Sequence, residues 1–245
     1  MYLLGYDVGS SSVKASLIDA DTGRSVASAF YPRKEMKIDA PRPGWAEQDP
    51  DQWWTNLILA TNDVMQASEI DPSSIKSIGI AYQMHGLVLV DKDMKLLRSS
   101  IIWCDSRAVA HGDHAMEKIG QEQCLSHLLN SPGNFTASKL SWVIMNEPEL
   151  YEKAHKFMLP GDFIAMKMTG EIATTPSGLS EGILWDFPEE KRADFLLEHY
   201  DIPGEMIPDT VPTFSEQGLL TDKAADETGL VPGIPVTYRA GDQPN

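Results

Sequence analysis

The hydrophobic pattern of the chain begins with three short strands. Residues 2–7, 13–19 and 25–31 each form an apolar or alternating run. Small-residue turns separate them, first Val8-Gly9-Ser10-Ser11-Ser12 and then Asp21-Thr22-Gly23. Turns of this composition join neighbouring antiparallel strands. The opening of the chain therefore predicts a β-meander.

A helix and a buried strand are predicted next. The helix begins near Pro50, with Asp49 or Asp51 as its cap. Its inward-facing residues are Trp53, Trp54, Leu57, Ile58, Val64 and Met65. Residues 75–81 form a continuous apolar run, which is typical of the centre of a sheet. Residues 86–90 are expected to return beside them as a partner strand.

Short strands then alternate with helices. Residues 101–103 predict a buried strand that leads into a helix ending at Ile119, and residues 124–200 are mostly helical in pattern. Within that region we expect a helix from Thr136 to Met145, a strand from Lys156 to Leu159 and a helix from Gly161 to Met168. A Pro- and Gly-rich connection, with a strand or two near residues 218–220, precedes a final strand at residues 234–238. The pattern predicts a mixed α/β fold.

Composition narrows the class of protein. The 245 residues suffice for one large domain or two small ones. The net charge of −16 disfavours nucleic acid and anionic membrane as partners, since both attract clustered Lys and Arg. The two cysteines form no disulfide framework, and we find neither a secretory signal nor an apolar run that could span a bilayer. We expect a cytoplasmic protein.

The first turn has the composition of a phosphate site. Asp7 stands at the open end of its strand, where a carboxylate could hold a metal ion directly or through water. Gly9 allows the backbone to approach an anion, and Ser10, Ser11 and Ser12 add hydroxyls and turn N–H groups. The alternative is an ordinary hairpin with a polar tip.

Two further segments could contact a substrate. Gln83, Met84 and His85 lie between two apolar strands, where the imidazole could bond a hydroxyl and Met84 could supply an apolar wall. The alternative is a turn with a satisfied histidine, which the tetrapeptide alone favours. Trp103 could pack on the C–H face of a sugar while Asp105 and Arg107 reach its hydroxyls. The alternative is a helix cap at Asp105 paired locally with Arg107.

The Gly241-Asp242 pair ends the last strand. An aspartate after a glycine can approach a bound hydroxyl and accept its proton as the oxygen attacks a phosphoryl group. The alternative is an Asp-containing turn. Because this turn resembles the start of a functional loop, we expect the sequence to stop at a domain boundary.

Taken together, these segments resemble the N-terminal, sugar-binding domain of the FGGY family of carbohydrate kinases, and within it the xylulokinase-like members. The resemblance runs in order through residues 7–14, 45–50, 53–54, 83–86, 103–107, 158–163 and 241–242. The first segment, which includes Lys14, is shared by the wider actin-like superfamily. The Gln-Met-His-Gly segment at residues 83–86 is the more specific one.

The resemblance implies an actin-like ATPase domain of the ribonuclease-H-like kind, an α/β fold with a mixed β-sheet flanked by helices. It implies Mg²⁺ and ATP as cofactors, with Asp7 positioning the metal and the turn from Gly9 to Ser12 approaching the phosphates. Met84 and His85 would line the ketose pocket and Asp242 would be the base. A nucleotide-binding domain would follow Asn245, so residues 1–245 alone are expected to be inactive.

Two departures from the family pattern concern the same segments. Ser10 stands where a threonine is usual, which keeps the hydroxyl. Arg239 and Gln243 stand near Gly241-Asp242, where glycine and asparagine are usual. The second departure leaves the base assignment intact and puts sugar selectivity in doubt.

The sequence therefore predicts ATP-dependent phosphorylation of a ketopentose, D-xylulose first, to the 5-phosphate. The alternatives are a kinase for another ketose or polyol, such as L-xylulose, ribulose or gluconate, and an actin-like ATPase or sugar sensor that phosphorylates no sugar. The expected partners are a small sugar and ATP, with neither nucleic acid nor membrane. Kinases of this type are often dimers, so a homodimer stays open.

Overall fold

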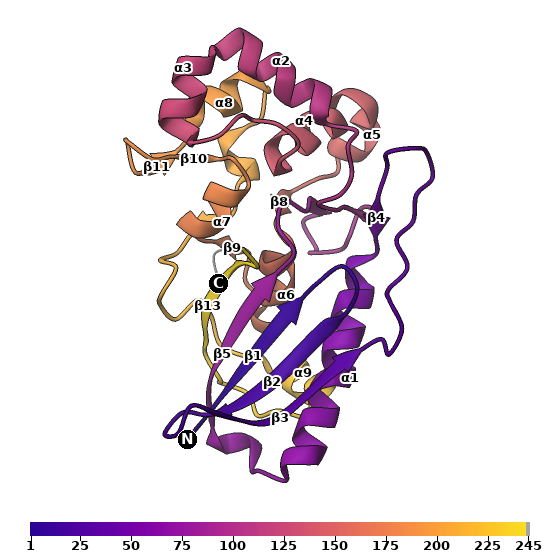
Figure 1. Ribbon diagram of the computed structural model, residues 1–245, viewed down its shortest axis with the longest axis vertical. Helices are drawn as coiled ribbons and strands as arrows, with labels where there is room; N and C mark the ends of the chain where they lie inside the picture. Colours follow the sequence, from indigo (N-terminus) through magenta and orange to yellow (C-terminus); the bar gives the residue numbers. More distant parts are fainter. Residues whose placement is uncertain (244–245) are drawn as a thin grey trace.

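The computed structural model describes residues 1–243 and is built around a five-stranded mixed sheet. The strand order is β13-β5-β1-β2-β3. The strands are β1 (Tyr2–Val8), β2 (Val13–Asp19), β3 (Arg24–Tyr31), β5 (Ile75–Tyr82) and β13 (Val236–Gly241). The predicted meander is confirmed, since β1, β2 and β3 pair antiparallel, whereas β5 and β13 run parallel to β1 (Figure 1).

The apolar residues that dominate β5 are explained by its place in the sheet. It pairs with β1 on one side and with β13 on the other, so it lies away from both edges. Ile78, Ile80 and Tyr82 are fully buried on the face that the helices cover. From Ser77 onward, buried residues alternate with partly exposed ones, so one face of β5 packs on the main core and the other is only partly covered.

Helix α1 (Pro50–Ser68) covers one face of the sheet. It begins where the sequence predicts, with the Asp49 carboxylate accepting from the Asp51 N–H and Pro50 in the first turn. The buried side chains of Trp53 and Leu57 pack into the main hydrophobic core. Two further helices, α6 (Pro160–Thr169) and α9 (Asp222–Thr228), pack beside α1 on this face (Figure 1).

Helix α9 lies within the stretch that we predicted to be irregular connection. Its ends carry ordinary helix signals, because the Thr221 hydroxyl accepts from the Ala224 N–H and Gly229 ends the helix in the left-handed conformation. Near residues 218–220 there is an isolated bridge between Leu219 and Pro235 in place of the strand that we expected.

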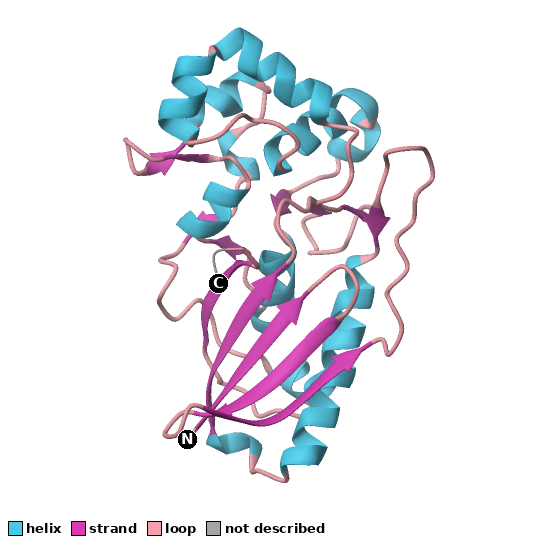
Figure 2. Cartoon of the chain, viewed as in Figure 1, coloured by secondary structure: helices cyan, strands magenta, loops and turns pink. Residues whose placement is uncertain are grey.

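A second group of helices stands beyond one end of the sheet and has its own hydrophobic core (Figure 2). These helices are α2 (Val109–Ile119), α3 (Gln121–Gln123), the π-helix η2 (Cys124–Leu128), α4 (Thr136–Asn146), α5 (Pro148–Tyr151), α7 (Pro176–Glu181) and α8 (Asp194–His199). Short 3₁₀ turns are η1 (Pro72–Ser74) and η3 (Gly204–Met206). The predicted helical character of residues 124–200 is confirmed.

Pairs of short strands lie outside the central sheet. They are β4 (Glu47–Gln48) with β7 (Ser100–Ile101), β6 (Val88–Val90) with β8 (Lys156–Met158), β9 (Ala173–Thr174) with β12 (Asp209–Thr210), and β10 (Trp185–Asp186) with β11 (Lys191–Arg192). The prediction that residues 86–90 return beside β5 is wrong. Because β1 and β13 already occupy both sides of β5, β6 finds its partner in β8.

Among the described residues, no helix combines the length and the apolar character that a bilayer crossing requires. The longest helix, α1, has a charged and polar outer face and an apolar inner face.

Two leucines of α1 provide a test of this packing. Leu57 is completely buried and Leu59 is 41% exposed. Leu57→Ala should lower the free energy of unfolding by about 2–5 kcal/mol, because it removes buried methyl groups and leaves a cavity. Leu59→Ala, the matched control, should change it by less than about 0.5 kcal/mol. Urea denaturation measures both, and equal effects would contradict the assigned face of α1.

Candidate functional site

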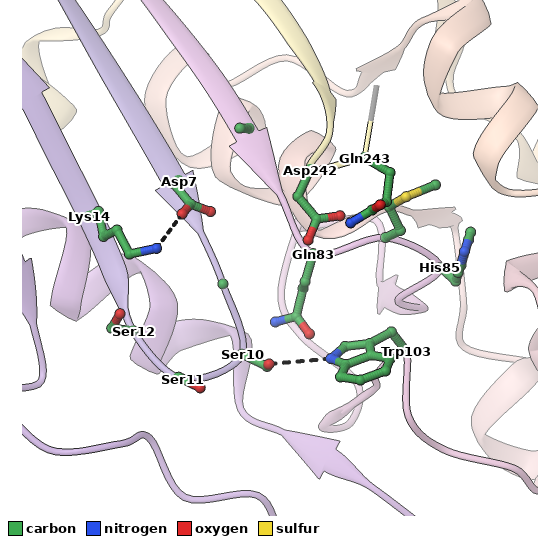
Figure 3. A pocket seen from close by; sticks show the side chains of 13 residues that line it. Asp7, Ser10, Ser11, Ser12, Lys14, Gln83, His85, Trp103, Asp242 and Gln243 are labelled. Carbon is green, nitrogen blue, oxygen red and sulfur yellow. Dashed lines mark hydrogen bonds and ion pairs between the residues drawn. The ribbon is translucent and has the colours of Figure 1, made fainter. Parts of the chain in front are cut away.

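Three parallel strands end at the same edge of the sheet, and a pocket of about 710 Å³ opens there (Figure 3). The pocket is lined by Asp7, Gly9, Ser10, Ser11, Ser12, Lys14, Ala81, Gln83, Met84, His85, Trp103, Asp242 and Gln243. The ends of β1, β5 and β13 thus bring together segments that are up to 235 positions apart in sequence, a placement typical of sites in α/β folds.

Asp7 and Lys14 face each other across the first hairpin. They are directly paired in the β1–β2 register, and Lys14 Nζ lies 2.7 Å from Asp7 Oδ2. Between them the Gly9 N–H donates to the Ser12 carbonyl at 3.1 Å, which closes the turn. A methyl group on Gly9 would lie 3.1 Å from that same oxygen, so the tight turn favours glycine. One carboxylate and one cation therefore flank a turn that is open to the pocket.

Gln83 connects the end of β5 with this turn. Its Nε2 donates to Gln48 Oε1 at 3.2 Å, and Gln48 Nε2 donates to the Ser10 carbonyl at 2.7 Å. Trp53 Nε1 donates to the same Gln48 oxygen at 3.2 Å. Gln48 itself lies outside our predicted set of site residues, although it belongs to residues 45–50, one of the segments that carry the family resemblance. The relay fixes Ser10 relative to Gln83.

His85 is held in one orientation by its surroundings. Its backbone is left-handed, with φ of 59°. Its Nδ1 lies 2.8 Å from the Glu181 carbonyl, and its ring packs edge-on against Phe135 at 4.4 Å. Since a carbonyl can only accept, Nδ1 carries the proton and Nε2 is the acceptor of the ring. Burial lowers the pKa of His85 to about 4, which keeps the imidazole neutral at physiological pH.

Lys139 supports the same loop from behind and was missed by our sequence analysis. It lies on α4, is fully buried, and its Nζ donates to the His85 carbonyl at 2.7 Å. Burial lowers the pKa of Lys139 to about 7, while Asp105 raises it in part. The sequence did contain a signal that could have identified Lys139. It is a lysine on the apolar face of the predicted helix at residues 136–145, beside Leu140 and Val143, which are buried.

Trp103 does line the pocket, whereas Asp105 and Arg107 do not. Trp103 is 52% exposed and its Nε1 donates to Ser10 Oγ at 3.2 Å. Asp105 and Arg107 are buried against each other, with Arg107 Nη2 2.6 Å from Asp105 Oδ2. The Ala46 N–H donates to the same carboxylate at 2.6 Å. The local pairing is therefore the reading that the structure supports, and we remove both residues from the candidate substrate site.

The alternative prediction, that Asp105 caps the following helix, is also wrong. Helix α2 begins at Val109, and the Asp105 carboxylate accepts from the Arg107 N–H at 2.8 Å instead of capping the helix. The Arg107 guanidinium lies 3.7 Å above the Trp45 ring. Asp105 and Arg107 thus anchor the Trp45 loop, which in turn carries Gln48.

Asp242 continues the sheet by one more hydrogen bond. Its N–H donates to the Tyr82 carbonyl at 2.8 Å, so the turn after β13 stays attached to β5. Its side chain is exposed and points into the pocket near Gln83, on the side opposite Ser11 and Ser12 (Figure 3). An exposed carboxylate at a fixed backbone position has the arrangement that a general base needs.

The environment of His85 predicts a pH effect on stability. Its folded pKa of about 4 lies below the ordinary 6.5, so the unfolded chain binds this proton more readily. The free energy of unfolding therefore has its full value above pH 6.5. It decreases as the pH falls toward 4, by at most about 3 kcal/mol. Asparagine tolerates the left-handed backbone at this position, so the His85→Asn protein should fold. Between pH 6.5 and 4 its free energy of unfolding, measured by urea denaturation, should decrease less than that of the wild type.

The control for this prediction is His155→Asn, which makes the same change at an exposed histidine. It should melt with the same pH dependence as the wild type. An identical pH dependence for all three proteins would contradict the buried, neutral state of His85.

This chain resembles known proteins over nearly its whole length. Residues 2–245 match the model of the FGGY family of carbohydrate kinases, N-terminal domain. The chain is 33% identical to xylulose kinase from Escherichia coli over 245 residues, and the alignment covers 99% of this chain and 48% of that protein. It is 31% identical to glycerol kinase from Thermococcus kodakarensis over 246 residues, again with 99% of this chain and 48% of that protein covered.

The structure agrees with the same family. Xylulose kinase from Rhodospirillum rubrum superposes with a TM-score of 0.90 at 27% identity, covering 99% of this chain and 49% of that one. This confirms the predicted actin-like, mixed α/β class. The chain spans about half the length of the curated relatives that it matches. With its family model, its relatives and its fold in agreement, this chain belongs to the FGGY family of carbohydrate kinases.

Proposed function

We propose that this chain is the sugar-binding part of an ATP-dependent ketose kinase that converts D-xylulose to D-xylulose 5-phosphate. The observation that carries the proposal is the single pocket that gathers the Asp7 turn, the Met84-His85 loop and Asp242. Relatives named xylulose kinase at 31–34% identity support the choice of sugar.

Two groups of the pocket suit the hydroxyls of an open-chain ketose. Asp242 accepts the proton of the terminal hydroxyl as that oxygen forms its bond to the γ-phosphorus of ATP. The bond from that phosphorus to the bridging oxygen breaks, and ADP leaves with the electron pair. His85 Nε2, as an acceptor, takes a hydrogen bond from another hydroxyl, while the Met84 side chain and Trp103 ring supply apolar contact for C–H groups.

The residues at the first turn fit a magnesium nucleotide. Asp7 would hold the ion, alone or through water, and Lys14 and the N–H groups of the turn from Gly9 to Ser12 would face the phosphates. Among the described residues there is no group of three carboxylates, histidines or cysteines that could hold a metal. This agrees with Mg²⁺ sites of kinases, where phosphate oxygens and water supply most ligands. Bound Mg²⁺ and ATP would supply the phosphoryl group and neutralise its charge.

A polyol kinase is the second candidate, because a relative named glycerol kinase matches at 31% identity over the same residues. A sugar sensor that hydrolyses ATP without phosphorylating sugar is less well supported. Such a protein has no use for a carboxylate placed beside Met84 and His85 in one pocket.

ADP release tests both the substrate and the base. A full-length protein carrying this chain should release ADP with D-xylulose and more slowly with ribulose, gluconate or glycerol. Asp242→Ala should lower kcat with D-xylulose by about 10²–10⁴-fold, since proton transfer to a positioned base contributes about this much. Asp226→Ala, at an exposed acid on α9, is the control and should be unchanged. A rate of ADP release that does not depend on added sugar and is unchanged by Asp242→Ala would contradict the kinase proposal.

The support of His85 by Lys139 predicts a change in sugar affinity. Lys139→Met keeps much of the buried volume and removes the hydrogen bond to the His85 carbonyl. We expect KM for the ketose to rise about tenfold, which equals about 1.4 kcal/mol, with a smaller change in kcat. Steady-state kinetics measure both, with Lys118→Met at an exposed position on α2 as the control. An unaltered KM in a folded Lys139→Met protein would contradict the role of Lys139.

A further inference from the structure

Glu181 is the last residue of α7 and lies against the turn that carries Asp242. Its side chain is 5% exposed. A methyl group on Gly241 would lie only 1.9 Å from Glu181 Oε2 and 2.6 Å from Met84 Cγ. The Glu181 carboxyl and the Met84 side chain therefore pack directly on the backbone that precedes Asp242.

The backbone of the same residue holds His85. The Glu181 carbonyl accepts from His85 Nδ1 at 2.8 Å. One residue therefore contacts both sides of the proposed sugar site: its side chain packs on Gly241, directly before the proposed base, and its main chain bonds the proposed hydroxyl acceptor, His85. Short helix α7 is itself fixed at its start, where the Thr175 hydroxyl accepts from the Gly178 N–H.

We propose that Glu181 is a positioning residue that sets the separation between Asp242 and His85. This separation is the distance between the proposed base and the group that binds a second hydroxyl of the substrate. This inference rests on the proposed function, since it assigns those two residues to a polyhydroxy substrate. Glu181 itself need not touch the sugar or the phosphate.

The charge of Glu181 follows from the groups that face it. Asp162 of α6 and Asp242 are acidic, and the Arg239 guanidinium of β13 is already paired with Asp162, with Nε 3.0 Å from Oδ1. The Tyr82 hydroxyl of β5 faces the carboxyl, although neither Glu181 oxygen has a well-formed hydrogen bond within the described chain.

Burial therefore raises the pKa of Glu181 well above its usual value, and Asp162 and Asp242 add to this, while Tyr82 opposes it. As a neutral acid, Glu181 can lie beside Asp242 without repelling it. His85, which bonds its main chain, is neutral as well, because burial lowers the His85 pKa to about 4.

The raised pKa of Glu181 makes the stability of the folded chain depend on pH. The folded chain binds the Glu181 proton more tightly than the unfolded chain, whose glutamates titrate near 4.5. Stability from this group is full below pH 4.5 and is lost as the pH rises toward the folded pKa. Glu181→Gln keeps the shape of the neutral acid and cannot lose a proton, so it should not show this loss.

The experiment compares Glu181→Gln and Glu181→Ala in the full-length protein, with Glu198→Gln as the matched control on the exposed side of α8. Kinetics with D-xylulose and melting temperatures are measured from pH 5 to 9. We expect Glu181→Gln to keep kcat and KM within about twofold at pH 7, and its melting temperature to rise relative to the wild type as the pH increases. Glu181→Ala should lower kcat by about 10–100-fold, because a misplacement near 1 Å has an effect of this size.

Each other outcome overturns the inference. Unchanged kinetics in a folded Glu181→Ala protein would show that the carboxyl positions nothing, and equal damage in the Gln and Ala variants would show that its charge is required. If the Ala variant does not fold, Glu181→Asp, which withdraws the carboxyl by one methylene, should lower kcat in the same direction. If the unaltered protein shows no sugar-dependent ADP release, the proposed function fails and this inference fails with it. Failure of the variants alone leaves the proposed function intact.

Discussion

The parallel alignment of β1, β5 and β13 is the constraint on which the rest of the structure depends. Their register places Asp7, Ala81 and Ala240 in one row across the sheet, with Val8, Tyr82 and Gly241 in the next. Asp242 follows directly and is still bonded to β5 through the Tyr82 carbonyl. Neighbouring strands lie about 4.8 Å apart and successive residues rise about 3.3 Å. The Asp7 and Asp242 backbones, two strands and two residues apart in this register, are therefore held roughly 12 Å from each other. The proposed phosphate-binding turn and the proposed base thus share one pocket without any loop having to bridge them.

Much of this arrangement could be predicted from the sequence because it depends on local patterns. The meander, the Pro50 helix and the buried β5 each have a periodicity or cap that a short window contains, and the segments that line the pocket stand at predicted strand ends. The wrong placement of Asp105 and Arg107 in the substrate site has a physical cause. Asp105 and Arg107 also follow a short buried strand, β7, but this strand pairs with β4 and not with the central sheet. The sequence pattern of a strand end is the same in both cases, whereas the sheet to which the strand belongs decides whether its polar residues reach the pocket or pair with each other.

The residues that sequence reasoning missed are buried polar groups with distant partners. Lys139 bonds His85 from 54 positions away, Gln48 bonds Gln83 from 35 positions away, and Glu181 bonds His85 from 96 positions away. A buried lysine or glutamate in an apolar helix face contradicts the usual preference of these residues for solvent, which is a signal that something lies opposite. The partner cannot be read from that signal, because it is fixed only when α4 and α7 pack against the loop after β5.

The same packing offsets the acidity of the groups in and behind the pocket in two different ways, by ion pairs and by burial. This matters in a chain with a net charge of −16 that is proposed to bind an anionic nucleotide. Asp7 is paired with Lys14, and Asp162 with the buried Arg239. Glu181 forms no ion pair among the described residues, and burial together with its acidic neighbours raises its pKa well above the usual value. Of these four carboxyl groups, Asp242 is the one that is exposed to the pocket with no ion pair among the described residues. A base needs a free carboxylate at the point where a hydroxyl arrives. The ion pairs of Asp7 and Asp162 and the raised pKa of Glu181 would allow Asp242 to fill this proposed role without adding to a larger repulsion of the phosphates.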